Sequence, residues 1–155
     1  MRIVFTSCIR YLDTHAQREW NTIREREPDH LFLLGDNIYM DWGIHWHEPK
    51  IKPISFFRAR MRQMYNRQWS NANFKRIVNE MTLKNGFHGI WDDHDCGWDN
   101  VKVASLKETQ NIKKIMYSRG QFYKHFPLSA AHNSIFYAHD TELARFIFLD
   151  NRSYA

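Results

Sequence analysis

The sequence predicts an α/β fold in one domain. A strand-like segment at residues 3–6, an amphipathic segment at about 14–26 and a second strand-like segment at 30–34 give a strand, helix, strand pattern. Two predicted strands run directly into turns that carry aspartate, at Asp36 and Asp93. The carboxyl ends of parallel strands meet at one edge of a sheet, so these two turns are expected to lie together.

The remaining elements follow from the spacing of apolar residues. Three further helices are predicted over residues 54–68, 71–81 and 104–125. A strand at 86–91 precedes Asp93, and segments 134–139 and 143–149 predict a β-hairpin. Residues 41–53 are too interrupted by Gly and Pro for regular structure, and they form a candidate rim of the site.

Composition is typical of a folded globular domain and argues against disorder throughout the chain. The 155 residues are 43% hydrophobic and 15% aromatic, and 22 Lys and Arg against 17 Asp and Glu give a formal charge of +5. This charge favours anions such as phosphates. Nucleic-acid binding is supported only by the arginines and aromatic residues of 58–67, since no recognition signature is present.

The two cysteines, Cys8 and Cys96, are too few for a disulfide framework, which favours a reducing compartment. The N-terminus lacks the charged and long apolar regions of a signal peptide. No apolar run approaches the ~20 residues that span a bilayer. We therefore expect a cytoplasmic protein without membrane contact, unless a leader is missing from the sequence.

Residues 91–95 read Trp-Asp-Asp-His-Asp and present three carboxylates and an imidazole at a strand exit. Oxygen ligands grouped around one histidine are typical of a metal site. Aspartates at strand exits are also common as turn and helix-cap residues that bind backbone amides. We favour metal ligation for Asp36 and Asp93, and both interpretations remain open for Asp92 and Asp95.

Such a cluster suits the hydrolysis of phosphoesters. Two metal ions about 3.5–4 Å apart can orient an oxygen nucleophile and offset charge on phosphoryl oxygens, and carboxylates can bridge them. A histidine beside the ions can stabilise the transferring group or protonate the leaving oxygen. His94 lies between two aspartates and is the candidate for this role.

Four motifs in order resemble those of the alkaline phosphatase D (PhoD-like) metallophosphatases. They are Ser-Cys at residues 7–8, Leu-Gly-Asp-Asn-Ile-Tyr at 34–39, the motif at 91–95, and Phe-Leu-Asp-Asn-Arg-Ser-Tyr at 148–154. The resemblance covers nearly the whole chain. It implies the αββα sandwich of the calcineurin-like phosphoesterases, with mixed sheets and flanking helices, and a metal-dependent hydrolase of small phosphomonoesters or phosphodiesters.

The resemblance also implies a ligand set. Cys8 would bind iron as a thiolate, Tyr39 would bind the same iron as a phenolate, and Asp36 would bridge two metal ions. Asp93 would be a further ligand, calcium the second kind of metal, and His94 the catalytic histidine. From its residue type alone, Cys8 in a strand is as well explained as a packed core residue.

Other candidate residues have weaker support. Arg152 can contact a substrate phosphate through its planar guanidinium, or can pair with Asp150 or another acid. Cys96 matches no motif and is expected to pack in the core. Six further histidines lack motif support and are expected on the surface or satisfied in the core: His45, His47, His88, His125, His132 and His139. Of these, His45 and His47 in the loop could also touch substrate.

Members of the family continue beyond the last of the four motifs, into further strands and late Asp and His metal ligands. Residues 1–155 are therefore expected to form the N-terminal part of a truncated catalytic domain, with apolar sheet surface left uncovered. A second chain or a second copy would then complete the fold. The alternative is a non-catalytic remnant that binds a metal ion or a phosphorylated or protein partner.

Overall fold

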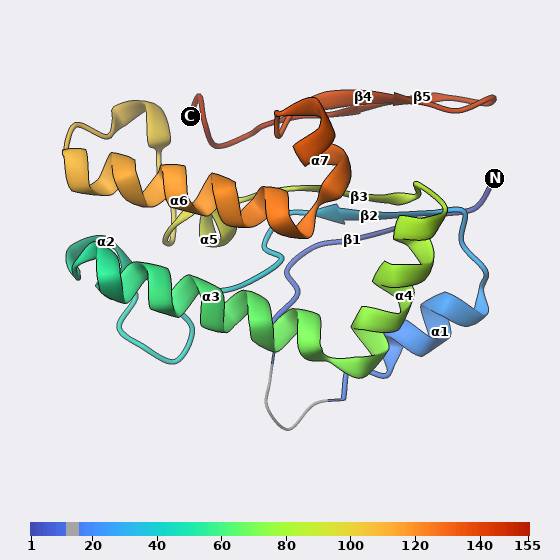
Figure 1. Cartoon of the computed structure of the whole chain (residues 1–155), viewed down its shortest axis with the longest axis horizontal. Helices are drawn as coiled ribbons and strands as arrows, with labels where there is room; N and C mark the ends of the chain where they lie inside the picture. The colour runs from blue at the N-terminus through green and yellow to red at the C-terminus, as the bar shows by residue number, and fades with distance from the viewer. Residues whose placement is uncertain (12–15) are drawn as a thin grey trace.

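The strands form two sheets in the computed structural model, which describes residues 1–11 and 16–155 (Figure 1). Strands β1 (Ile3–Thr6), β2 (His30–Leu34) and β3 (Phe87–Ile90) pair in parallel in that order. Strands β4 (Tyr137–Asp140) and β5 (Arg145–Phe148) form an antiparallel hairpin. The predicted α/β class, the parallel pairing and the hairpin are confirmed.

The helices of the described residues include all of those predicted. They are α1 (Glu19–Glu25), α2 (Glu48–Ile51), α3 (Ile54–Ser70), α4 (Ala72–Leu83), α5 (Asp93–Cys96), α6 (Thr109–His125) and α7 (Pro127–His132). Helix α6 starts later than predicted because residues 103–105 form a separate 3₁₀ turn, and the predicted beginning of the first helix, at residues 14–15, lies outside the described residues. No helix in the described part of the chain is both long and apolar enough to cross a bilayer.

Strand β2 is covered on both faces, which explains its nearly continuous apolar sequence. Leu31 and Leu33 are fully buried in the main core with residues of α3, α4 and α6. Phe32 points to the opposite face, where its ring centroid lies 5.1 Å from Phe146 and 5.0 Å from Phe148 of the hairpin. The hairpin and the helices α3 and α4 therefore lie on opposite sides of the parallel sheet, as Figure 1 shows.

A glycine allows the helical layer to approach β3. A Cβ atom at Gly89 would lie 2.2 Å from the ring of Phe126, which is buried at the junction of α6 and α7. Any larger residue would push this junction away from the sheet. The close contact fixes the helical layer beside the strand that delivers the acidic motif.

The register of the parallel sheet aligns the carboxyl ends of its strands. Thr6 is opposite Leu33, and Leu34 is opposite Ile90. The loops that follow the three strands consequently leave from one edge of the sheet. This edge is where the sequence predicts the functional residues.

Candidate metal centre

The first two strand exits are joined by backbone hydrogen bonds. The amide of Cys8 donates to the carbonyl of Gly35 at 3.2 Å, and the amide of Ile9 donates to the carbonyl of Asp36 at 2.8 Å. Cys8 and Asp36 both adopt left-handed backbone conformations, with φ of 57° and 53°. Such conformations are uncommon for residues other than glycine and often occur at functional sites. They turn both side chains to the same edge of the sheet.

The third exit is joined to the second through Asp95. Its carboxylate accepts hydrogen bonds from the backbone amides of Asn37 at 2.8 Å and Ile38 at 3.1 Å. It also accepts from the amide of Asp92 at 3.0 Å, while Asp92 caps α5 in return as a capping box. Of the two interpretations that the sequence leaves open, the structure supports the capping role for Asp92 and Asp95.

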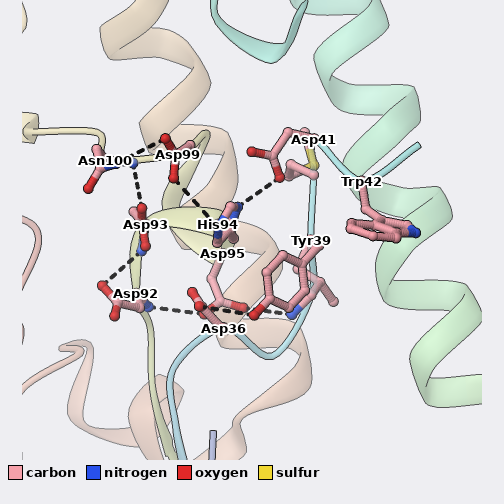
Figure 2. A network of polar contacts seen from close by, with 12 residues as sticks. Asp36, Tyr39, Asp41, Trp42, Asp92, Asp93, His94, Asp95, Asp99 and Asn100 are labelled. Atoms are coloured by element: carbon pink, nitrogen blue, oxygen red, sulfur yellow. Dashed lines mark hydrogen bonds and ion pairs between the residues drawn. The ribbon is translucent and has the colours of Figure 1, made fainter. Parts of the chain in front are cut away.

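The expected ligand groups converge on Asp36 (Figure 2). Ligand atoms of Asp36, Asp93 and His94 all lie within 4.8 Å of one another. The hydroxyl of Tyr39 donates to Asp36 Oδ2 at 3.2 Å, and Cys8 Sγ is 3.8 Å from the same oxygen. The structure therefore brings together all five residues for which a metal-binding or catalytic role is predicted, from three separate segments of the chain.

The environment of Asp36 fits a bound cation. Its Oδ1 is buried and has no hydrogen-bond partner among the described residues, a situation that costs free energy in a folded protein. Burial, together with the charges of Asp93 and Asp92, raises the pKa of Asp36 despite the opposing effects of His94 and Tyr39. A metal ion would provide a partner for this oxygen and would offset the repulsion between the carboxylates.

His94 is held by a carboxylate that the sequence analysis missed. Its Nδ1 lies 2.7 Å from Asp41 Oδ1, while its Nε2 is 4.0 Å from Asp99 Oδ1, beyond hydrogen-bond distance (Figure 2). Burial of the imidazole opposes its charge, but the hydrogen bond and charge of Asp41, with Asp36 and Asp93, raise the pKa of His94 to about 9. Without an ion in the site, this environment favours the imidazolium form of His94. No sequence signal pointed to Asp41, which begins a stretch without regular spacing.

Arg152 lies at the site and pairs with two of the aspartates there. The guanidinium donates from Nε to Asp92 and from Nη2 to Asp93 Oδ1, the latter at 3.4 Å. Asp150 instead accepts from the indole of Trp91 at 2.8 Å. Of the two predicted roles for Arg152, the structure shows the ion pair with acids. The partners are Asp92 and Asp93, and not Asp150.

The other candidates lie away from the metal centre. Cys96 is fully buried, as expected for a packed core residue. His45 and His47 stack on each other with ring centroids 5.2 Å apart on the loop before α2, and in the described part of the chain no hydrogen bond or ring contact joins them to the ligand residues. His125 stacks against Tyr65 in the helical layer at 4.1 Å.

A comparison with known families agrees with this arrangement. The family model for PhoD-like phosphatases matches residues 3–155. This chain belongs to the PhoD-like phosphatase family. Searches of curated proteins and of solved structures gave no match. PhoD-like phosphatases are metal-dependent, and the group at Asp36, Asp93 and His94 gives this PhoD-like phosphatase a set of side chains that suits a metal ion.

Proposed function

We propose that this PhoD-like phosphatase hydrolyses small phosphomonoesters or phosphodiesters at the Asp36 centre. The observation that carries the proposal is the convergence of the Cys8 thiol, the Tyr39 phenol and the Asp93 carboxylate on Asp36, whose Oδ1 is buried and lacks a partner in the described chain. Such a set binds cations, and cations at a strand edge are suited to phosphoryl chemistry.

The ligand types suggest which metals bind where. Cys8 and Tyr39 would hold iron, Asp36 would lie between this ion and a second one, and Asp93 would favour calcium through its oxygens. When bound, the ions would supply an activated water and offset charge on the phosphoryl oxygens. Cys8 is a free thiol, and the cytoplasmic location that we propose would keep it reduced.

His94 is placed to handle a proton. Asp41 binds Nδ1, which leaves Nε2 as the nitrogen that can face a substrate oxygen. When the ring is protonated, Nε2 can donate a hydrogen bond to a phosphoryl oxygen or a proton to the leaving oxygen, and the hydrogen bond and charge of Asp41 favour this form. Asp41 is a positioning residue in this proposal, because it acts through His94.

Replacement of Asp36 tests the assignment. Loss of a residue that only supports a metal ligand typically costs 10–100-fold in metal affinity or activity. Asp36 is proposed as a direct ligand, so Asp36→Asn is expected to lower turnover of p-nitrophenyl phosphate and bis(p-nitrophenyl) phosphate by more than about a hundredfold. Asp140→Asn is the matched control, because Asp140 is exposed on the hairpin and pairs with Arg145. Wild-type turnover by Asp36→Asn would show that the assignment is wrong.

A second candidate function is a non-catalytic role in binding a metal or a partner. It is favoured by exposed apolar residues on and beside the hairpin, since Phe136, Ile147 and Leu149 are 53%, 69% and 65% exposed. Elemental analysis separates the candidates. Two or more tightly held ions per chain that are lost in Asp36→Asn support catalysis, whereas no ion at the Asp36 centre, together with self-association in analytical ultracentrifugation, supports a partner-binding role.

A further inference from the structure

Three histidines form a second cluster at the other end of the strands. His30 begins β2, His88 is the second residue of β3, and His139 is on β4 of the hairpin. One ring nitrogen from each lies within 4.8 Å of the other two. His30 and the exit of β2 at Leu34 are about 13 Å apart at the usual rise of a strand. The cluster is therefore separate from the Asp36 centre.

The imidazoles leave nitrogen atoms without partners in the interior. His88 is fully buried, and its Nδ1 pairs with the hydroxyl of Tyr137 at 3.2 Å. Within the described part of the chain, His88 Nε2 and His30 Nδ1 are buried without a hydrogen-bond partner. Buried polar atoms are rarely left in this state, so two of them in one cluster require an explanation. A metal ion would satisfy both.

Two histidines of the cluster favour the neutral form, which is the form that binds metal ions. Burial and repulsion from His139 and His30 lower the pKa of His88 to about 3, against a smaller opposing effect of the Asn85 backbone. Burial, followed by His139, also lowers the pKa of His30. A neutral imidazole has the lone pair that a ligand needs. The nearest acids are engaged elsewhere, since Asp29 accepts from the amide of Arg2 and Asp140 pairs with Arg145.

We propose that His30, His88 and His139 bind one divalent transition-metal ion, for which Zn²⁺ is the best match. Three nitrogen ligands without carboxylates favour Zn²⁺ over Ca²⁺ or Mg²⁺, and a water molecule would fill the fourth position. Tetrahedral ligation at 2.0–2.1 Å places ligand nitrogens about 3.4 Å apart, which small rotations of the three rings can provide.

The bound ion would fasten the hairpin to the parallel sheet. Two ligands come from neighbouring strands of one sheet and the third comes from the other sheet. Tyr137 would accept a hydrogen bond from His88 Nδ1 and so fix the ring, as second-shell residues commonly do. The role is structural, and its loss is expected to affect stability at the hairpin more than chemistry at Asp36.

Zinc binding by the whole chain tests this proposal. All measurements use protein that carries Asp36→Asn, because this substitution weakens metal binding at the Asp36 centre. Calorimetric titration of chelator-treated protein should show one Zn²⁺ per chain, and Zn²⁺ should raise the midpoint of thermal unfolding by several degrees. His139→Phe keeps a ring at this half-buried position and removes the ligand. It should weaken zinc binding by at least about a hundredfold and abolish the thermal shift, with the zinc-free midpoint unchanged.

His132→Phe is the matched control, because His132 is an exposed histidine that stacks on Tyr137 outside the cluster. It should keep the full response to zinc. Co²⁺ gives an independent readout, since nitrogen ligation without sulfur yields visible bands and no thiolate charge-transfer band. The nitrogen-only bands should be lost in His139→Phe, whereas any thiolate band would report on Cys8 of the Asp36 centre. An equal zinc response in His139→Phe, or no binding at all, would overturn the proposal, and the three rings would then be aromatic packing only.

Discussion

Asp41 favours the charged form of His94, and its influence can be measured. Its side chain is only 8% exposed and lies 2.7 Å from the imidazole. Asp41→Asn removes the charge that favours the imidazolium, so the pKa of His94 should fall. If His94 acts as a proton donor, activity is lost as pH rises through this pKa, and the alkaline limb of the kcat profile should move to lower pH in the variant.

Asp99→Asn is the control for this prediction, because Asp99 Oδ1 is 4.0 Å from His94 and makes no hydrogen bond to it. It should move the profile less than Asp41→Asn does. A role of Asp41 in folding alone would lower kcat at every pH and leave the position of the alkaline limb unchanged.

At the residue scale, the sequence predicted the ligand groups but not their supports. Asp36 and Asp93 were predictable because each follows an apolar strand, and parallel pairing brings such exits together. Asp41 lies in a segment without periodicity, and its contact with His94 joins residues 53 positions apart. The histidine cluster was missed for the same reason, since nothing in the local sequence shows that β4 places His139 beside His30.

At the scale of elements, Asp95 joins the loop after β2 to the turn at the start of α5. Asp95→Ala would leave the amides of Asn37, Ile38 and Asp92 without their acceptor. Unpaired buried donors cost about 1–3 kcal/mol each, with partial relief from water, so we expect a loss of roughly 3 kcal/mol in the free energy of unfolding by urea. A loss below about 0.5 kcal/mol would contradict this role for Asp95.

The contact between α3 and α6 predicts a dependence of stability on pH. His125 of α6 stacks on Tyr65 of α3, and burial lowers its pKa despite the hydrogen bond with Gln121. The folded state therefore favours the neutral ring. Its stabilising contribution is complete above the unfolded pKa of about 6.5 and declines as pH falls toward the lower folded value.

Urea unfolding at pH 7 and pH 5 measures this effect. The wild type should lose stability between these values, and His125→Phe, which cannot take up a proton, should lose less. Since other histidines also titrate, the difference between the two proteins is the quantity that reports on His125. Identical losses would show that His125 contributes nothing to the pH dependence.

Short elements were harder to predict than long ones. The helices α3, α4 and α6 have 12 to 17 residues and a clear apolar spacing, so the sequence analysis found them. Helices α2 and α5 have four residues each. Helix α5 begins with the capping box of Asp92, and two carbonyls of α2 accept hydrogen bonds from Lys114 of α6. A single turn of helix contains too few residues to show a period.

For the whole molecule, Phe32 connects the two sheets. Its ring lies within 5.1 Å of Phe146 and Phe148. Removal of a buried aromatic ring typically costs 3–5 kcal/mol, so Phe32→Ala should destabilise the protein by about 3–4 kcal/mol. Phe136→Ala, at an exposed phenylalanine, should change stability by less than about 0.5 kcal/mol. Equal effects in urea unfolding would contradict the packing of the hairpin on β2.

The order of the parallel strands has a consequence for folding kinetics. The exits of β1, β2 and β3 supply Cys8, Asp36 and Asp93, and each pairing between these strands closes a long stretch of chain. Contacts between distant residues form late because of their entropic cost. The full set of ligands from the three exits is therefore expected to assemble only when the last of these pairings forms. The rate of metal uptake during refolding would therefore report the rate of the final step of sheet assembly.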